Sequence, residues 1–520
     1  MAGGHGWAAG RAAGHGFGHD LGVTGPLPPE DPRDALIREQ AALISGLSGQ
    51  VTNLSAQIAE LTGLVRELRG QLEAARRAAS RNSGNSSMPP SADDLPGRKA
   101  PEPRAKPGGG RKPGKQEGAP GAHLAWSASP DERVPLFPEG ACGCGLNLAQ
   151  AADLGVVASR QVIDVPLAAA TVTQYDEHAV RCGCGKVHEA APAPGAGQAG
   201  TAAWGLNVRA LAVFLLVMHH VPVERCAGVI EAIAGVRPSD GWVHSLLERA
   251  AGAVRGACLL IRALVVTASV ICADETPIRV GPGPKARKRY LLVACTRLLT
   301  CYFLGDRSLA SFDGFVLGDL SGSVAVHDRY QNYDAYNGIA HQLCCAHLLR
   351  DLADAAEQYP DAIWPGQAAD ALRALIHAAN EARGQALDAA PAEDIAADLR
   401  LFRSAVLVGL QEVPRVPGAK KKQKPGRMLL ECLRDREADV LRFLSDLRIP
   451  QTSNQAERDL RPAKTQQKIS GRLRSEKATR HRYAIRGYAS TAAKHGIPAL
   501  AAIRDALAGN PWMPALPAIA

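Results

Sequence analysis

The feature that most constrains this chain is a heptad repeat near its N-terminus. Apolar residues recur at every seventh position, and a leucine lies three residues after several of them. The repeat consists of Ile37, Ile44, Val51, Ile58, Val65 and Leu72, with Leu47, Leu54, Leu61 and Leu68 in the second position. β-Branched residues in the first position with leucine in the second favour a parallel two-stranded coiled coil. We therefore predict a leucine-zipper-like coiled coil over 33–79 that makes the protein a homodimer; a helix packed on its own domain is the alternative.

The segments beside this helix have compositions that cannot form a packed core. Residues 1–32 are rich in Gly, Ala, His and Pro without periodicity and are predicted to be a disordered tail. Residues 80–125 are dominated by Ser, Pro, Gly, Lys and Arg and form a mobile basic linker. The linker either follows a phosphate backbone or is only a soluble tether. Residues 511–520 form a C-terminal tail.

Composition places the protein among soluble, multidomain proteins. No apolar run resembles a signal peptide or reaches the ~18 residues that a membrane helix needs. We therefore expect a cytoplasmic protein with no membrane partner. The formal net charge is +9, so the clustered basic residues suggest an acidic polymer as the partner.

Four of the twelve cysteines occur as two close pairs, in ACGCG and RCGCG. Two thiol pairs separated by a loop can supply four thiolates to a tetrahedral Zn²⁺ ion. The ligands of this structural zinc would be Cys142, Cys144, Cys182 and Cys184, in a zinc-ribbon-like module over 126–195 with strands at 159–166 and 170–181. A relic without metal and a redox pair are the alternatives, and His188 is a substitute ligand. The other cysteines are interpreted as small core residues.

The remaining chain changes from helical to strand periodicity. Residues 200–268 show a helical period, which predicts either a helix-turn-helix that reads DNA or a helical packing domain. Beyond Ala268, continuous apolar strands at SVICADETPIRV, RYLLVACT, LLTCYFL and GSVAVHDRY are followed by a long helical stretch over about 352–447. This order predicts an α/β domain over 269–510 with a helical insertion that clamps DNA.

Two carboxylates stand where apolar strands become polar. Asp274 and Asp328 would lie side by side if their strands were neighbours in one sheet, which is unfavourable unless a cation lies between them. We therefore predict Mg²⁺ ligands; two solvated strand-end aspartates are the alternative. Glu275 would face the opposite side of the strand and is interpreted as a supporting group.

A third acid opens a basic region near the C-terminus. A helix that begins at Thr452 or Ser453 places Asn454 and Glu457 on one face. The basic residues that follow are predicted to hold DNA phosphates, and they include Arg458, Arg461, Lys464, Lys468, Arg472 and Arg474. A carboxylate beside a phosphate-binding surface suits metal-dependent phosphodiester chemistry. A solvated basic helix face is the alternative.

At this point the residues carry a family resemblance. ADETP, VHDRYQNYDAYN, CCAHLLRDL, SNQAERDLRPAK and GYASTAAKHGIPALAAI, together with NSGNSSMPPSADD and the two cysteine pairs, resemble transposases of the insertion sequence 66 family. The resemblance covers about residues 35–508, in the family's order. Three segments differ from the family's usual pattern. Arg329 stands where a glycine is common, and Cys345 stands where a tryptophan is common before Ala346 and His347. Thr465, Gln466, Gln467 and Lys468 stand where the family commonly has Arg-Lys-Asn and an aromatic residue.

The resemblance implies a DDE catalytic domain of ribonuclease H-like fold. Asp274, Asp328 and Glu457 match the three acids, which would bind two Mg²⁺ or Mn²⁺ ions, with Asn454 and His347 as supporting residues. The implied partners are transposon ends, target DNA and accessory proteins of the same element. The implied setting is a bacterial cytoplasm, with the protein on the nucleoid when it is bound to DNA.

Three functions compete for this sequence. The favoured function is a DNA transposase that binds terminal inverted repeats, cleaves strands and transfers them to a target. A ribonuclease H-like nuclease that cuts without joining is the second, and an inactive DNA-binding remnant of a mobile element is the third. The intact set of Asp274, Asp328 and Glu457 argues against the remnant.

Overall fold

The computed structural model describes residues 32–80, 126–163, 169–191, 202–418 and 423–516. The predicted N-terminal tail before Pro32 and the predicted linker after Ser80 lie outside these ranges, as do residues 192–201 and the end of the predicted C-terminal tail. The chain up to Ser80 and the chain beyond it are two units, and each is described by itself.

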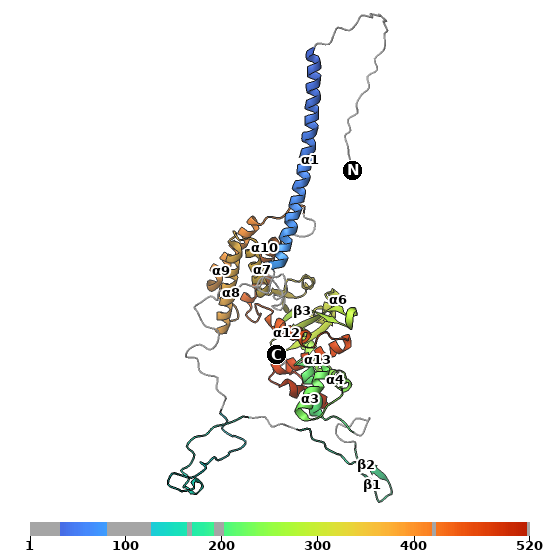
Figure 1. The fold of residues 1–520 in the computed structure, drawn as a ribbon, viewed down its shortest axis with the longest axis vertical. Coiled ribbons are helices and arrows are strands. Elements are labelled where there is room, and N and C mark those ends of the chain that lie inside the picture. Colours follow the sequence, from blue (N-terminus) through green and yellow to red (C-terminus); the bar gives the residue numbers. More distant parts are fainter. Residues whose placement is uncertain (1–31, 81–125, 164–168, 192–201, 419–422, 517–520) are drawn as a thin grey trace. The chain divides into compact units, whose positions relative to one another are not determined.

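The heptad region forms one continuous helix, α1 (Pro32–Ser80), drawn in blue in Figure 1. The apolar positions of the repeat are exposed along it: Ile44 is 64% and Leu54 57% exposed. Leucine and isoleucine side chains in such a continuous row are normally covered by a second helix. The helix is therefore as predicted, and its pairing with a second copy stays a prediction.

The predicted catalytic region contains a mixed sheet. Within the described residues it has five strands, in the order β5-β4-β3-β6-β7. These are β3 (Val270–Val280), β4 (Arg287–Cys295), β5 (Thr300–Gly305), β6 (Val324–His327) and β7 (Ala340–Leu343). β3, β4 and β5 are antiparallel neighbours, whereas β6 is parallel to β3 and β7 is parallel to β6. The four strands predicted from the sequence are confirmed, and β7 was not predicted because AHQL lacks an apolar run.

Each face of the sheet builds its own core, because successive strand residues point to opposite sides. Cys272 and Val293 pack on one side, and Ile271 and Leu292 pack on the other. The first core includes α7 (Cys345–Gln358), α8 (Trp364–Gly384), α9 (Ala392–Glu412), α10 (Pro425–Asp435), α11 (Glu437–Ser445) and α12 (Asn454–Ile469). The second includes α2 (Leu206–Val217), α3 (Val223–Ala234), α4 (Asp240–Ala253), α5 (Arg255–Val266), α6 (Leu309–Phe315), α13 (Glu476–Lys494) and α14 (Ala499–Leu507).

The helices of residues 200–268 share their core with the sheet. Ser239 caps α4 and accepts a hydrogen bond from the backbone N–H of Trp242 at 3.3 Å. The C-terminal carbonyls of α2 receive hydrogen bonds from α13: the guanidinium of Arg482 donates to Leu216, and that of Arg486 donates to Val217 at 2.9 Å. Both arginines are buried. They therefore serve the fold, although they belong to the basic C-terminal region of the sequence.

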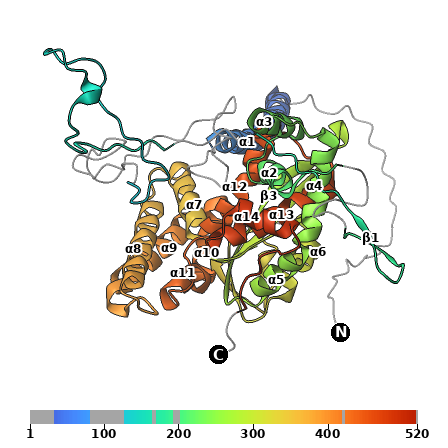
Figure 2. The same cartoon turned by 90° about the horizontal axis from the view of Figure 1, so that it is seen from below.

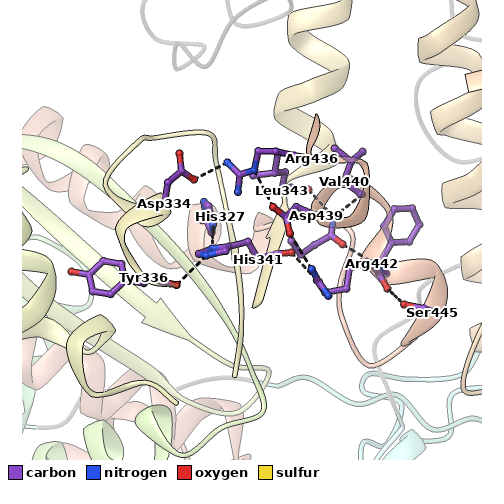
Figure 3. Close-up of polar contacts among 12 residues, drawn as sticks. His327, Asp334, Tyr336, His341, Leu343, Arg436, Asp439, Val440, Arg442 and Ser445 are labelled. Carbon is purple, nitrogen blue, oxygen red and sulfur yellow. Dashed lines mark hydrogen bonds and ion pairs between the residues drawn. The ribbon is translucent and has the colours of Figure 1, made fainter. Parts of the chain in front are cut away.

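The stretch predicted to be a helical insertion is helical and corresponds to α7 to α11, with α7 beginning a few residues earlier than predicted; Figure 2 shows α8 to α11 grouped apart from α2 to α5. That these helices are an insertion stays a prediction. Polar contacts join them to the sheet edge (Figure 3). Arg436, between α10 and α11, pairs with Asp334 at 2.7 Å and with Asp439 at 2.9 Å. Arg442 donates to the carbonyl of His341 on β7 at 2.9 Å. The insertion is thereby fastened to the segment that follows Asp328.

No helix in the described ranges is long and apolar enough to span a lipid bilayer.

Candidate active site

The sheet register brings the first two acids together. β3 and β6 run parallel with Cys272 opposite Val326. The same offset, carried two residues further, sets Asp274 opposite Asp328, which directly follows β6. Asp328 Oδ1 accepts the backbone N–H of Tyr330 at 2.9 Å, which fixes the turn beyond the strand. The carboxylates of Asp274 and Asp328 therefore lie beside each other, just beyond the point where the pairing of β3 with β6 ends.

The environment of Asp274 disfavours its negative charge. Burial raises the pKa of Asp274 well above its usual range, and the neighbouring charges of Glu275 and Asp328 raise it further. The backbone N–H of Glu275 donates to Asp274 Oδ1 at 2.8 Å and compensates only in part. Paired, desolvated carboxylates of this kind fit a divalent cation, because Mg²⁺ and Mn²⁺ prefer oxygen ligands and would offset the repulsion.

Glu275 lies on the other face, as the alternation of the strand predicts. Its buried carboxylate pairs with Arg307 at 2.7 Å and accepts the hydroxyl of Tyr333 at 3.1 Å. Burial and the charge of Asp328 raise the pKa of Glu275 to about 7, against the opposing effect of Arg307. Arg307 also stacks on Tyr290 and Tyr330, with its guanidinium 4.9 and 4.3 Å from their ring centres. Glu275 therefore anchors the back of the site.

Glu457 lies in the first turn of α12, which begins at Asn454 after Ser453, as predicted. Ala456, Leu460 and Ala463 pack α12 into the same core as Cys272, on the face of the sheet to which Asp274 belongs. Glu457 Oε1 accepts a hydrogen bond from Arg350 on α7 at 3.0 Å. Asn454 is exposed at the start of the helix. Glu457 therefore faces the site from a separate element and is already paired with a cation.

His347, in the first turn of α7, has electrostatic contact with all three acids. Its Nε2 is 3.9 Å from Glu457 Oε1, and its charge interacts with both Asp274 and Asp328. Burial opposes the charge of His347, but the hydrogen bond and charge of Cys344 outweigh burial and raise the pKa of His347 to about 9. A cationic His347 offsets part of the negative charge of the acids.

Cys344 and Arg350 are site residues that the sequence reading missed. Cys344 was interpreted as a core residue, yet its Sγ accepts the backbone N–H of Ser453 at 3.3 Å and so ties α7 to the start of α12. The signal was available, since Cys344 and His347 are three residues apart at a helix start. Arg350 carried no such signal, because its contact with Glu457 joins residues that are far apart in the chain.

The predicted DNA-binding residues lie along α12 and in the segment that follows it. Arg458, Arg461, Lys468, Arg472 and Arg474 are exposed, and Lys464 is half-buried. Glu457, Arg461, Lys464 and Lys468 follow helical spacing, so they share one face of α12. Burial lowers the pKa of Lys464, and the charge of the Asp274 carboxylate opposes that effect. Lys464 is therefore close enough to Asp274 for their charges to interact.

The two cysteine pairs form matching turns. The N–H of Cys142 donates to the carbonyl of Leu146, and the N–H of Cys182 donates to that of Lys186, both at 2.8 Å. Gly145 and Gly185 have φ angles of 90° and 88°, a backbone that glycine adopts readily. The hydrogen bond from Leu146 lowers the pKa of Cys144, and that from Cys184 lowers the pKa of Cys182. All four thiols are exposed, so a zinc ion could reach each of them.

Of the two strands predicted between these turns, only the last residues of the second form a strand in the described part of the chain. The stretch at 159–166 contains no strand in its described residues, and the stretch at 170–181 contains only β1 (Ala179–Arg181), which pairs with β2 (Val187–Glu189). Val162 and Val172 are 91% and 94% exposed, so β-branched residues have no core to pack against there. His188 lies on β2 and is exposed.

No preformed metal cluster is visible: among the residues that the structure describes, no group of three or more His, Cys, Asp or Glu side chains is arranged to hold a metal ion. The donor types nevertheless suit the expected ions. Carboxylates on three elements suit Mg²⁺ or Mn²⁺, and thiols in paired turns suit Zn²⁺. Metal binding at either site would therefore require the side chains to draw together.

Two family models match the sequence. The model of a family described as Transposase IS66 family matches residues 202–481, more than half of the chain. The model of a family of unknown function, DUF6444, matches residues 28–125. No curated protein matches the sequence.

Proposed function

The chain belongs to the IS66 transposase family, and we propose that it cleaves DNA at the terminal inverted repeats of a mobile element and joins those ends to target DNA. The observation that carries the proposal is the register of β3 and β6, which sets Asp274 opposite Asp328. Glu457 is on α12, which packs against the same face of the sheet. In this proposal the three acids form one DDE active site.

The strand arrangement supports a ribonuclease H-like fold for the catalytic domain. Three antiparallel strands lie beside two parallel ones, with β3 in the centre. The site then lies at the point where β3 is flanked by β4 on one side and by β6 on the other. The helical insertion enters directly after β7, and α12 returns the chain to the sheet with the third acid.

Asp274, Asp328 and Glu457 are the residues that would hold two Mg²⁺ or Mn²⁺ ions. When bound, such ions lower the pKa of an attacking water or hydroxyl and stabilise the leaving oxygen. His347 and Arg350 contact Glu457 and would keep its carboxylate in place. Hydrolysis would free a 3′-hydroxyl at the element's end. That hydroxyl would then attack a target phosphodiester, form a new phosphodiester bond and displace the 3′-oxygen of the target strand, which joins the two DNAs.

DNA binding is assigned to the exposed basic residues that follow Glu457. None of these residues caps α2 as Arg482 and Arg486 do, although Arg472 also donates to the carbonyl of Gly283 at 3.1 Å. Phosphate contacts of this type supply affinity without reading sequence. The zinc-bound module formed by the four paired cysteines, and dimerisation through α1, would organise two DNA ends in one complex.

The test is a strand-transfer assay with fluorescently labelled duplexes of the element's ends, a target plasmid and Mg²⁺. The wild-type protein should produce nicked ends and joined products, and Glu457→Gln should produce neither while it still binds the duplex. Asp370→Asn, on the exposed face of α8, is the matched control and should behave as the wild type. Cleavage without joined product would indicate a nuclease instead, and activity retained by Glu457→Gln would refute the proposed site.

A further inference from the structure

Helix α7 contacts both of the segments that carry the second and third acids. Two consecutive residues of α7 make these contacts, one with each segment. Arg350 Nη2 donates to Glu457 Oε1 at 3.0 Å, and Asp351 accepts a hydrogen bond from the guanidinium of Arg329, the residue after Asp328. A single helix therefore contacts Arg329, which is next to the second acid in the chain, and also contacts the third acid, Glu457.

Arg329 points into the protein rather than toward a DNA surface. Its guanidinium contacts the Asp351 carboxylate on α7 and the thiol of Cys432 on α10, and about a third of the side chain is exposed (30%). Asp351 is exposed to a similar extent (33%). An arginine satisfied by an ion pair has little reason to leave it for a phosphate. Arg329, the cationic residue next to Asp328, is thus paired with the helical insertion.

The segment that follows Asp328 is held a second time by the insertion. Arg436 pairs with Asp334 at 2.7 Å and with Asp439 at 2.9 Å (Figure 3). Asp328 and Asp334 bracket a short segment without a long strand or helix, so its position depends on side-chain contacts. Arg329 fixes its beginning and Arg436 fixes its end.

We propose that Arg329 and Asp351 form a positioning pair that sets the place of Asp328 relative to Glu457 and so prepares the acids for divalent cations. The inference rests on the function proposed above. Charge-assisted contacts behind metal ligands orient the ligands, and their loss typically weakens metal binding or activity about 10- to 100-fold. Because the pair is partly exposed, its removal should change the site more than the stability of the fold.

The test compares Arg329→Gln, Asp351→Asn and the double variant with the wild type. A matched control removes an exposed ion pair on α8, using Arg373→Gln and Asp370→Asn. The side chains of this pair are 2.6 Å apart and 54% and 75% exposed. Mn²⁺ binding is measured by the loss of the free-ion paramagnetic resonance signal, without DNA. Cleavage of labelled element ends and thermal melting are measured in parallel.

Each single variant should weaken Mn²⁺ binding about tenfold, and the double variant should be no weaker than the weaker single, because both changes remove one contact. Melting temperatures should stay within a few degrees, and the control variants should bind Mn²⁺ as the wild type does. If the variants bound Mn²⁺ as tightly as the wild type while the wild type cleaved DNA, the positioning pair would be wrong and the proposed function would stand. The expected Mn²⁺ pattern in a protein that never cleaves DNA would support the pair and overturn the function.

Discussion

Asp274 and Glu275 are neighbours in the chain but belong to opposite faces of the sheet, and this alternation separates their roles. Glu275 has a cationic partner in Arg307, so its buried charge is compensated. Asp274 has instead the nearby charges of Glu275 and Asp328, and burial raises its pKa well above the usual range. A group that destabilises the empty fold and is still present is typical of a functional site.

This difference predicts opposite effects of two substitutions. In metal-free buffer, Asp274→Asn should raise the free energy of unfolding by about 1 kcal/mol, because it removes repulsion with Asp328. Glu275→Ala should lower it by about 3 kcal/mol, because it leaves Arg307 and Tyr333 without their partner. Denaturant unfolding followed by circular dichroism measures both. Destabilisation by Asp274→Asn would contradict the account of the paired acids.

The basic residues near the C-terminus divide in a similar way. Arg482 is buried and donates to the carbonyl of Leu216, whereas Arg458 is exposed on α12. Arg482→Ala should lower stability by about 2 kcal/mol. Arg458→Ala should leave stability unchanged, weaken DNA binding and reduce the salt dependence of log Kd by about one phosphate contact.

Fluorescence anisotropy at several salt concentrations, together with melting curves, checks this pair. If Arg458→Ala lowered the melting temperature and left the salt dependence of DNA binding unchanged, the assignment of Arg458 to DNA binding would be wrong. Sequence alone could not make this division, since both arginines follow Glu457 in one basic run. Only the packing of α13 against α2 distinguishes them.

At the scale of elements, strands and caps were predictable where local patterns determine them. Ser239 caps α4, and β3 to β6 follow apolar runs. β7 escaped prediction because its short polar-rich segment becomes a strand only by pairing with β6. Most of the residues expected to form strands between the cysteine pairs do not, for the opposite reason: they favour strands, but no core covers them, and only Ala179–Arg181 is formed.

The matching turns around the cysteine pairs predict a metal-dependent module. The purified wild type should contain about one Zn²⁺ per chain, and Cys182→Ser should lose most of it, because two turns are needed to complete a tetrahedral site. Cys258→Ser, which alters a half-buried thiol on α5, should retain the zinc. Mass spectrometry of metal content measures both, and equal zinc in the two variants would refute the assignment.

At the scale of the whole molecule, two features of the sequence determine the assembly we propose. The three acids are far apart in the chain, so their grouping depends on sheet order and on α7, neither of which a local pattern reveals. The heptad seam is local, and its helix was predicted almost to the residue. What that seam contacts is a property of two chains together.

The seam predicts a dimer that depends on its leucines. Leu54→Asp combined with Leu61→Asp should convert the protein to a monomer, because charges in the second heptad position cannot be buried between helices. Ala56→Asp, on the outer side of the same helix, should leave the dimer intact. Light scattering after size-exclusion chromatography gives the mass of each, and a monomeric wild type would contradict the coiled coil.

The most direct test of the central claim replaces the acids by cysteine and changes the metal. In the strand-cleavage assay, Asp274→Cys and Asp328→Cys should each be inactive with Mg²⁺ and should regain activity with Mn²⁺, because thiolate is a poor ligand for Mg²⁺ and a better one for Mn²⁺. The wild type should cleave with either ion. Full activity of the cysteine variants in Mg²⁺, or the same loss with both ions, would contradict metal ligation by these two aspartates.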